Sequence, residues 1–349
     1  MRPYRYDLPR YQSIRKGEWI LIRSERHSII RQDLVKQGVE SLPRVLWEGT
    51  KKGEYKENAQ GYWYKNCPSP EDIKKRVLNN KKWFTAKTLE RKKYFFELRS
   101  YLRKLLPKIK SGKLTSKQCL DELITAKAWM TKTRPYANMS QLIIDRVIDE
   151  YFNKLSAIVT LKTLILYFLS LFLTRVSRSR SQYYRNMAPA IPSIMIYSYF
   201  KDALKEDYED KITKAGIISI RRIHDFKFPP PPLIEEIKEL NFDKKRIGLP
   251  IEISEILKKK KRRTNGVIRR YSEILPQLIN MSEETSYTYR TYMICVNHLL
   301  EKIAIFLVVN YQIKNIPEIL NYSLQQIIKK FDEIEKTPPF LFQKTKSLK

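Results

Sequence analysis

Apolar residues recur at helical spacing over much of the chain, most clearly in the stretch 85–106. Its leucines and phenylalanines follow one another at intervals that bring side chains to one face of an α-helix: Leu89, Phe95, Phe96, Leu98, Leu102 and Leu105. The sequence KSGK at 110–113 is typical of a turn, and Thr115 or Ser116 is typical of the residue before a second helix. Together these features predict a helical hairpin over 67–135, with basic residues on its outer faces.

The stretch 140–174 changes character halfway along. Its first part, 140–155, is amphipathic, whereas the 19 residues from Ser156 to Thr174 carry a single charge, Lys162. A helix of that length and composition either crosses a bilayer or lies at the centre of a protein or a large assembly. Burial is favoured, because the amphipathic part runs into the apolar part without a break.

The N-terminal residues 1–66 show no sustained periodicity, since glycine, proline, lysine and aromatic residues alternate. One strand is predicted at Trp19–Arg23, from the apolar run WILI. A helix is predicted from Ser24 to about Gln37, with Gly38 as its C-terminal cap. The remainder is typical of a basic and aromatic arm that becomes ordered on a partner surface.

Towards the C-terminus the pattern is again helical. Ser69 and Pro70 are typical of a helix start, as is Ser282, which precedes a long apolar and largely buried stretch. Asn315 is typical of a helix end, and Pro317 of the start of a further amphipathic helix. Between the helical parts, the four prolines at 229–232 predict a stiff spacer.

These elements predict a mainly α-helical protein with basic irregular segments and one short β element. We divide the chain into five segments: a basic arm, a basic hairpin, a hydrophobic helical core, an extended proline-rich and basic segment, and a C-terminal hairpin with a tail. Their expected bounds are 1–66, 67–135, 136–216, 217–280 and 281–349.

The charge of the chain gives information about its binding partner. Lysine and arginine total 68 and aspartate and glutamate 37, which leaves a net charge of +31. Between Glu71 and Arg134 there are 19 basic and 6 acidic residues, a net charge of +13. Charge of this size, spread along a chain that is 42% hydrophobic, indicates a folded protein with a polyanionic partner, either nucleic acid or an anionic membrane surface.

The most concentrated charge is the segment KKKKRRTNGVIRR, residues 258–270, where eight of thirteen residues are basic. Adjacent cations repel and Asn265-Gly266 is a turn signal, so we expect a loop that orders on phosphates. Its alternatives are a nuclear localisation signal and a solvated loop or membrane-surface patch. We expect phosphate contacts from Lys258, Lys259, Lys260, Lys261, Arg262, Arg263, Arg269 and Arg270 in this loop; from Arg91, Lys92, Lys93, Arg99, Arg103 and Lys104 on the hairpin; and from Arg175, Arg178, Arg180 and Arg185. Tyr183 and Tyr184 are expected to stack on bases.

Catalytic and cofactor signatures are absent from the sequence. There are 9 glycines and neither a dinucleotide-binding nor a P-loop motif. The three cysteines are far apart, which indicates a reducing compartment, and the pair Cys295 and His298 is too small for a structural zinc site. Glu235, Glu236 and Lys238 resemble the end of a nuclease motif but lack a strand-borne aspartate before them. We therefore expect no enzyme, no metal and no cofactor.

The interpretation that combines these features is a structural RNA-binding subunit of a large ribonucleoprotein, with an organellar, mitochondrial ribosome as the concrete candidate. Its partners would be ribosomal RNA and neighbouring proteins. A membrane subunit of an organellar complex, spanning at 156–174, and a DNA-binding nuclear or viral protein remain as alternatives.

Overall fold

Helices dominate the part of the chain that the structure describes, which confirms the mainly α fold. The structure is a computed structural model. It describes residues 14–16, 19–23, 28–47, 53–58, 61–66, 70–141, 143, 147, 150–151, 154–155, 226–237, 255 and 262–336. The apolar segment 156–174 lies outside these residues.

The predicted helical hairpin is confirmed as α4 (Lys81–Lys110) and α5 (Ser116–Gln141). The side chain of Asn80 accepts a hydrogen bond from the backbone N–H of Trp83 at 2.9 Å and so caps α4. Gly112 takes a positive φ of 68° in the connecting turn. Thr115 then caps α5, because its hydroxyl accepts from Gln118 N while Gln118 Oε1 accepts from Thr115 N.

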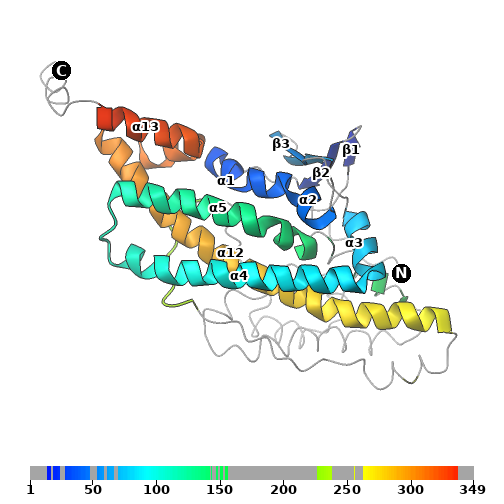
Figure 1. The fold of residues 1–349 in the computed structure, drawn as a ribbon. Helices are drawn as coiled ribbons and strands as arrows, with labels where there is room; N and C mark the ends of the chain where they lie inside the picture. Colours follow the sequence, from blue (N-terminus) through cyan, green and yellow to red (C-terminus); the bar gives the residue numbers. More distant parts are fainter. Residues whose placement is uncertain are drawn as a thin grey trace, which may run out of the picture.

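A single long helix, α12 (Arg262–Val309, 48 residues), crosses behind α4 and α5 (Figure 1). At a rise of about 1.5 Å per residue it is about 72 Å long. The predicted turn at Asn265-Gly266 and the predicted helix start at Ser282 are both wrong, since both lie inside α12. One reason is the apolar stripe that begins two residues after Gly266 and continues past Ser282, whose buried members include Ile268, Tyr271, Leu275, Leu278 and Met281. The boundary expected at 280/281 therefore falls inside one element.

The first helices, α1 (Ile29–Glu40) and α2 (Leu42–Trp47), pack on the opposite side of α5 from α12. The predicted start at Ser24 is not observed, because α1 begins after Ser28. Gly38 lies within α1 and does not cap it. Its backbone lies so close to α5 that an added Cβ would be 2.7 Å from the Cβ of Arg134 and 2.9 Å from the carbonyl oxygen of Met130. Gly38 is therefore required by close helix packing.

Replacing Gly38 with alanine is expected to lower the free energy of unfolding by about 1–3 kcal/mol, even though alanine favours helices. The added methyl group would overlap backbone atoms of α5, which cannot rotate away. Urea denaturation monitored by circular dichroism measures the effect. Gly266→Ala is the matched control, since that glycine also lies in a helix but has nothing within 4 Å of an added Cβ, and it should be neutral or stabilising. Equal stability of the two variants would contradict the packing argument.

A small antiparallel sheet lies at the end of the body near α2 and α3 (Pro70–Asn79) (Figure 1). Its strands are β1 (Ile14–Lys16), β2 (Trp19–Arg23), β3 (Glu54–Asn58) and β4 (Gly61–Lys65), in the order β1-β2-β4-β3. The strand predicted at Trp19–Arg23 is confirmed. The expectation of an irregular N-terminal arm is corrected, because neighbouring β segments pair with β2. Short strands with aromatic and charged residues lack a clear period and were missed for that reason.

The C-terminal end of α12 is followed by a 3₁₀ helix, η1 (Ile316–Asn321), and by α13 (Leu324–Lys336). Asn315 caps the start of η1, so the predicted helix opening at Pro317 is divided into two. The rings of Phe306 and Phe331 lie 4.8 Å apart and join α13 to α12. The last described helix, α13, therefore packs on α12, and Asp33 of α1 also accepts a hydrogen bond from Leu324 N at 2.9 Å.

Residues 226–237, which include the four prolines, form an extended strap on α4 and α12. Phe226, Ile234 and Ile237 are buried in the main core. Backbone groups of the strap are also bound, since Lys227 N donates to Asn297 at 3.3 Å and His298 Nε2 lies 2.8 Å from the carbonyl oxygen of Pro231. The segment predicted as a spacer is therefore docked on the helical body.

One described segment is long and apolar enough to cross a membrane by length and composition, Tyr287–Val309 of α12, and most of it is buried inside the body. Its buried side chains include Val296, Leu299, Leu300 and Ile303. This agrees with the buried helix that the sequence predicts there. In the amphipathic stretch 140–155, the described residues Val147, Tyr151 and Leu155 are likewise buried.

Candidate nucleic-acid interface

Many surface lysines of the helical body are neutralised by a carboxylate from another element or from the next helical turn. Lys117 pairs with Glu335 at 2.5 Å, Lys108 with Glu122 at 2.7 Å and Lys132 with Glu97 at 2.8 Å. Lys329 and Glu333 lie 4.0 Å apart, one turn from each other on α13. Such exposed pairs contribute little to stability, about 0–1 kcal/mol each, but they cancel local charge.

A second set of lysines has no such partner. Lys82, Lys92, Lys93 and Lys104 of α4 are exposed and, within the described part of the chain, have no carboxylate in ion-pair range. Lys82, Lys93 and Lys104 follow one another at eleven residues, close to three helical turns, so they project from one side of α4 at intervals of about 16.5 Å. Lys92 lies about 100° further round the helix, beside this row. We call these four lysines the basic face, and among the described residues their charge is not neutralised.

The basic face includes three of the phosphate contacts expected from the sequence, Lys92, Lys93 and Lys104. Lys82 was missed, as was Lys75 on α3, which is likewise exposed and has no carboxylate partner among the described residues. The spacing of Lys82, Lys93 and Lys104 is the signal that identifies Lys82. Arg269, also expected, is exposed on α12.

Two of the expected contacts, Arg91 and Arg99, do not lie on an outer face. Arg91 is fully buried and Arg99 nearly so, and both bind the carboxylate of Glu284 in α12. Arg91 binds Oε2 of Glu284, while Nη1 of Arg99 donates to Oε1 at 2.5 Å. Arg91 also donates to Met281 O at 2.5 Å and to Thr285 Oγ1 at 2.7 Å. The two arginines therefore join α4 to α12, and we remove them from the candidate interface.

The electrostatics of this buried group favour the charged carboxylate. Burial alone would raise the pKa of Glu284, but attraction and hydrogen bonds from Arg91 and Arg99 hold that pKa below its ordinary value. Burial lowers the pKa of Arg91, an effect that Glu284 opposes. Two cations share one anion here, so Glu284 is the residue whose loss would leave the most uncompensated charge.

Two further expected contacts use their guanidinium groups on backbone carbonyls. Arg103 Nε donates to Ile237 O of the strap at 3.0 Å. Arg270 donates to Leu78 O at 3.1 Å and to Val77 O at 2.8 Å, so it binds the C-terminal carbonyls of α3. Both residues help to assemble the body, and neither is a free cation.

The other expected contacts cannot be placed. The residues outside the described part of the chain are Lys258 to Lys261, Arg175, Arg178, Arg180, Tyr183, Tyr184 and Arg185. Arg262 and Arg263 are described only as the first residues of α12. The expected loop over 258–270 is corrected in part, because residues 262–270 are the first turns of α12.

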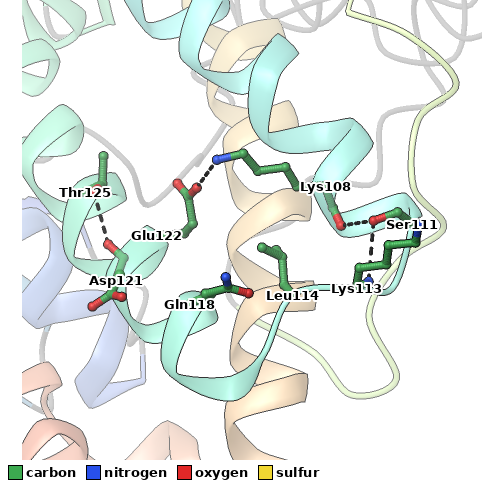
Figure 2. Close-up of a pocket in the computed structure, with 8 residues that line it drawn as sticks. All are labelled: Lys108, Ser111, Lys113, Leu114, Gln118, Asp121, Glu122 and Thr125. Carbon is green, nitrogen blue, oxygen red and sulfur yellow. Dashed lines mark hydrogen bonds and ion pairs between the residues drawn. The ribbon is translucent and has the colours of Figure 1, made fainter.

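A hollow of about 510 Å³ lies where α4 turns into α5 (Figure 2). Its lining carries two lysines, Lys108 and Lys113, and two carboxylates, Asp121 and Glu122, of which Lys108 and Glu122 form an ion pair. Tyr101 Oη also donates to Glu122 at 3.1 Å. Ser111 lies at its edge and donates to the carbonyl oxygen of Lys108 at 2.9 Å. The hollow presents neither a nucleophile beside a base nor a surplus of one charge.

The described residues contain no assembled metal-binding site and no reactive thiol. No group of three or more histidine, cysteine or acidic side chains comes together there. Cys295 is buried, and burial raises the pKa of its thiol to about 12, so it does not ionise at neutral pH. His298 binds the strap. Glu235 and Glu236 of the suspected nuclease pattern are exposed on the strap, and Lys238 is not described.

No protein-family model matches the chain, and no curated protein or solved structure shows significant similarity to it.

Proposed function

We propose that this chain is a structural RNA-binding subunit of a large ribonucleoprotein, and that the basic face of α4 contacts the RNA backbone. The observation that carries the proposal is the contrast between two sets of lysines. Lys108, Lys117 and Lys132 have carboxylate partners, whereas Lys82, Lys92, Lys93 and Lys104 have none among the described residues. Four cations left without counter-charges on one helix suit an external polyanion.

Phosphate is the anion that this arrangement suits best. Lysine is a compact point charge without directional base recognition, and each lysine that binds a phosphate releases condensed counterions. The remaining excess, up to the net charge of +31, would be neutralised in the same way. Contacts of this kind position a protein on a strand and do not select a sequence.

A structural role within an assembly is supported by the body itself. Its longest described helix is held by buried ion pairs and a continuous core, and the hollow between α4 and α5 carries equal numbers of positive and negative side chains. An organellar ribosome, in mitochondria, is proposed on composition, because long basic chains with few glycines suit a protein placed among RNA and neighbouring proteins.

The proposal is tested by sedimentation of the native chain through a sucrose gradient. We expect the protein in the heavy fractions with ribosomal particles, and a shift to lighter fractions after RNase treatment. Sedimentation near its own mass of 41.8 kDa with and without RNase would contradict the proposal. Insensitivity of a heavy fraction to RNase would indicate assembly through protein contacts alone.

The alternatives predict different results. A membrane subunit spanning at 156–174 would remain in the pellet after alkaline carbonate extraction, whereas a ribonucleoprotein subunit would be released. A DNA-binding protein would bind duplex DNA more tightly than RNA at the same salt concentration. The described residues favour neither alternative. The lysines of the basic face do not distinguish ribose from deoxyribose, and 156–174 lies outside the described residues.

A further inference from the structure

Two large apolar side chains project from the basic face. Leu89 is 61% exposed and Phe96 is 54% exposed. They are seven residues apart, about two helical turns, so both lie on the side of α4 that carries Lys93. Phe96 follows Lys92 and Lys93 by four and three residues, spacings at which side chains are neighbours on a helix.

The exposed ring of Phe96 is unlike its neighbours on α4. Phe84 and Phe95 are buried, and Phe95 packs against Tyr289 with ring centroids 5.6 Å apart. Lys132 lies over the rings of Tyr94 and Trp129 at the seam between α4 and α5. Phe96 has no ring contact and no cation over its ring among the described residues. Single exposed apolar residues are common on proteins, but this ring lies next to Lys92 and Lys93, which have no carboxylate partner among the described residues.

A ligand that satisfies both features must carry phosphates and a flat apolar surface. Unpaired bases in a single strand offer such a surface, because they can be splayed out and stacked on an aromatic ring. In a duplex the bases are stacked on one another, and a helix lying along its backbone would meet phosphates only. The combination of Phe96 with Lys92, Lys93 and Lys104 therefore favours an unpaired strand.

We propose that the basic face binds a single-stranded segment of RNA, with Phe96 stacked on one base and Lys92, Lys93 and Lys104 on the flanking phosphates. This inference rests on the proposed function and specifies the form of RNA. Leu89, about 10.5 Å further along the helix, lines the same face but cannot stack. The two residues therefore form a matched pair of exposed apolar side chains, of which one is expected to contribute to stacking.

The test is fluorescence anisotropy with the full-length chain and a labelled mixed-sequence RNA of about 15 nucleotides, single-stranded or annealed to its complement. Stacking on one base is lost in Phe96→Ala, which should weaken single-strand binding roughly 5- to 150-fold, while duplex binding changes less than about 2-fold. The slope of log K against log salt should stay the same, because no charge is lost. Phe96→Tyr should retain binding, and Leu89→Ala should change it less than about 3-fold. Alanine and tyrosine at exposed helical positions leave folding intact, which circular dichroism checks.

Several outcomes would overturn the inference. One is that Phe96→Ala leaves single-strand binding unchanged. Another is that it weakens duplex binding as much as single-strand binding, and a third is that Leu89→Ala weakens single-strand binding as much as Phe96→Ala does. Vesicles of phosphatidylcholine with phosphatidylserine form a further arm, since loss of vesicle binding in both alanine variants with unchanged RNA binding would assign the face to an anionic membrane. Failure of the proposed function is distinguishable, because the unmodified chain would then bind neither form of RNA.

Discussion

Replacing Glu284 with alanine is expected to lower the free energy of unfolding by about 3–5 kcal/mol. The change leaves Arg91 fully buried and Arg99 nearly so, with no carboxylate to neutralise them. It also removes the two ion pairs that join α4 to α12. Urea denaturation monitored by circular dichroism should show the transition at clearly lower urea than in the unmodified chain.

The control is Glu335→Ala, which removes an ion pair of similar length between exposed side chains, Glu335 and Lys117. It should cost no more than about 1 kcal/mol. Equal midpoints for Glu284→Ala and Glu335→Ala would contradict the structural role of the buried group. Acid provides a second readout: because the pKa of Glu284 is lowered on folding, its contribution is complete above the ordinary value of 4.5 and is lost as pH falls through the lower folded value. Glu284→Gln should lack that part of the pH dependence.

Changing Lys82, Lys92, Lys93 and Lys104 together to glutamine is expected to weaken RNA binding by on the order of 100-fold at about 0.1 M salt. The four side chains are exposed and have no carboxylate partner in the described structure, so their removal costs the protein no internal contact. Anisotropy with the labelled single strand measures the loss.

A matched control exists in the lysines that are paired. The control variant has four paired lysines changed together to glutamine: Lys108, Lys117, Lys132 and Lys329. Its net charge is lower than +31 by the same four units. Their positive charges are already cancelled locally, so binding should weaken far less, by about 10-fold at most. Equal losses in the two quadruple variants would show that overall charge, and not the basic face, determines affinity.

The elements that the sequence predicted well are those in which every local signal agrees. In α4 and α5, apolar spacing, the turn at Gly112 and the cap at Thr115 all point to one hairpin. In α12 the signals conflict, because Asn265-Gly266 favours a turn and Ser282 a helix start. The structure resolves the conflict in favour of the apolar stripe, since Ile268, Leu275 and Leu278 are buried along one continuous helix.

The candidate site was predictable only in part, because burial depends on partners far away in the chain. Arg91 and Lys92 are adjacent, yet one is buried and the other exposed, since each residue turns a helix by about 100°. Arg91 falls on the same stripe as Phe95, Leu98 and Leu102, and that spacing was the available sign that it faces inward. Its partner Glu284 is 193 residues away, and no local pattern connects the two.

The most direct test of the basic face is the salt dependence of RNA binding by the unmodified chain and by the variant that lacks Lys82, Lys92, Lys93 and Lys104. We expect log K to fall steeply and linearly with log salt for the unmodified chain. For the variant the slope should be shallower by about 3, since each phosphate contact on a single strand contributes about 0.7. A flat line for the unmodified chain, or the same slope for both proteins, would contradict the claim that these lysines bind the RNA backbone.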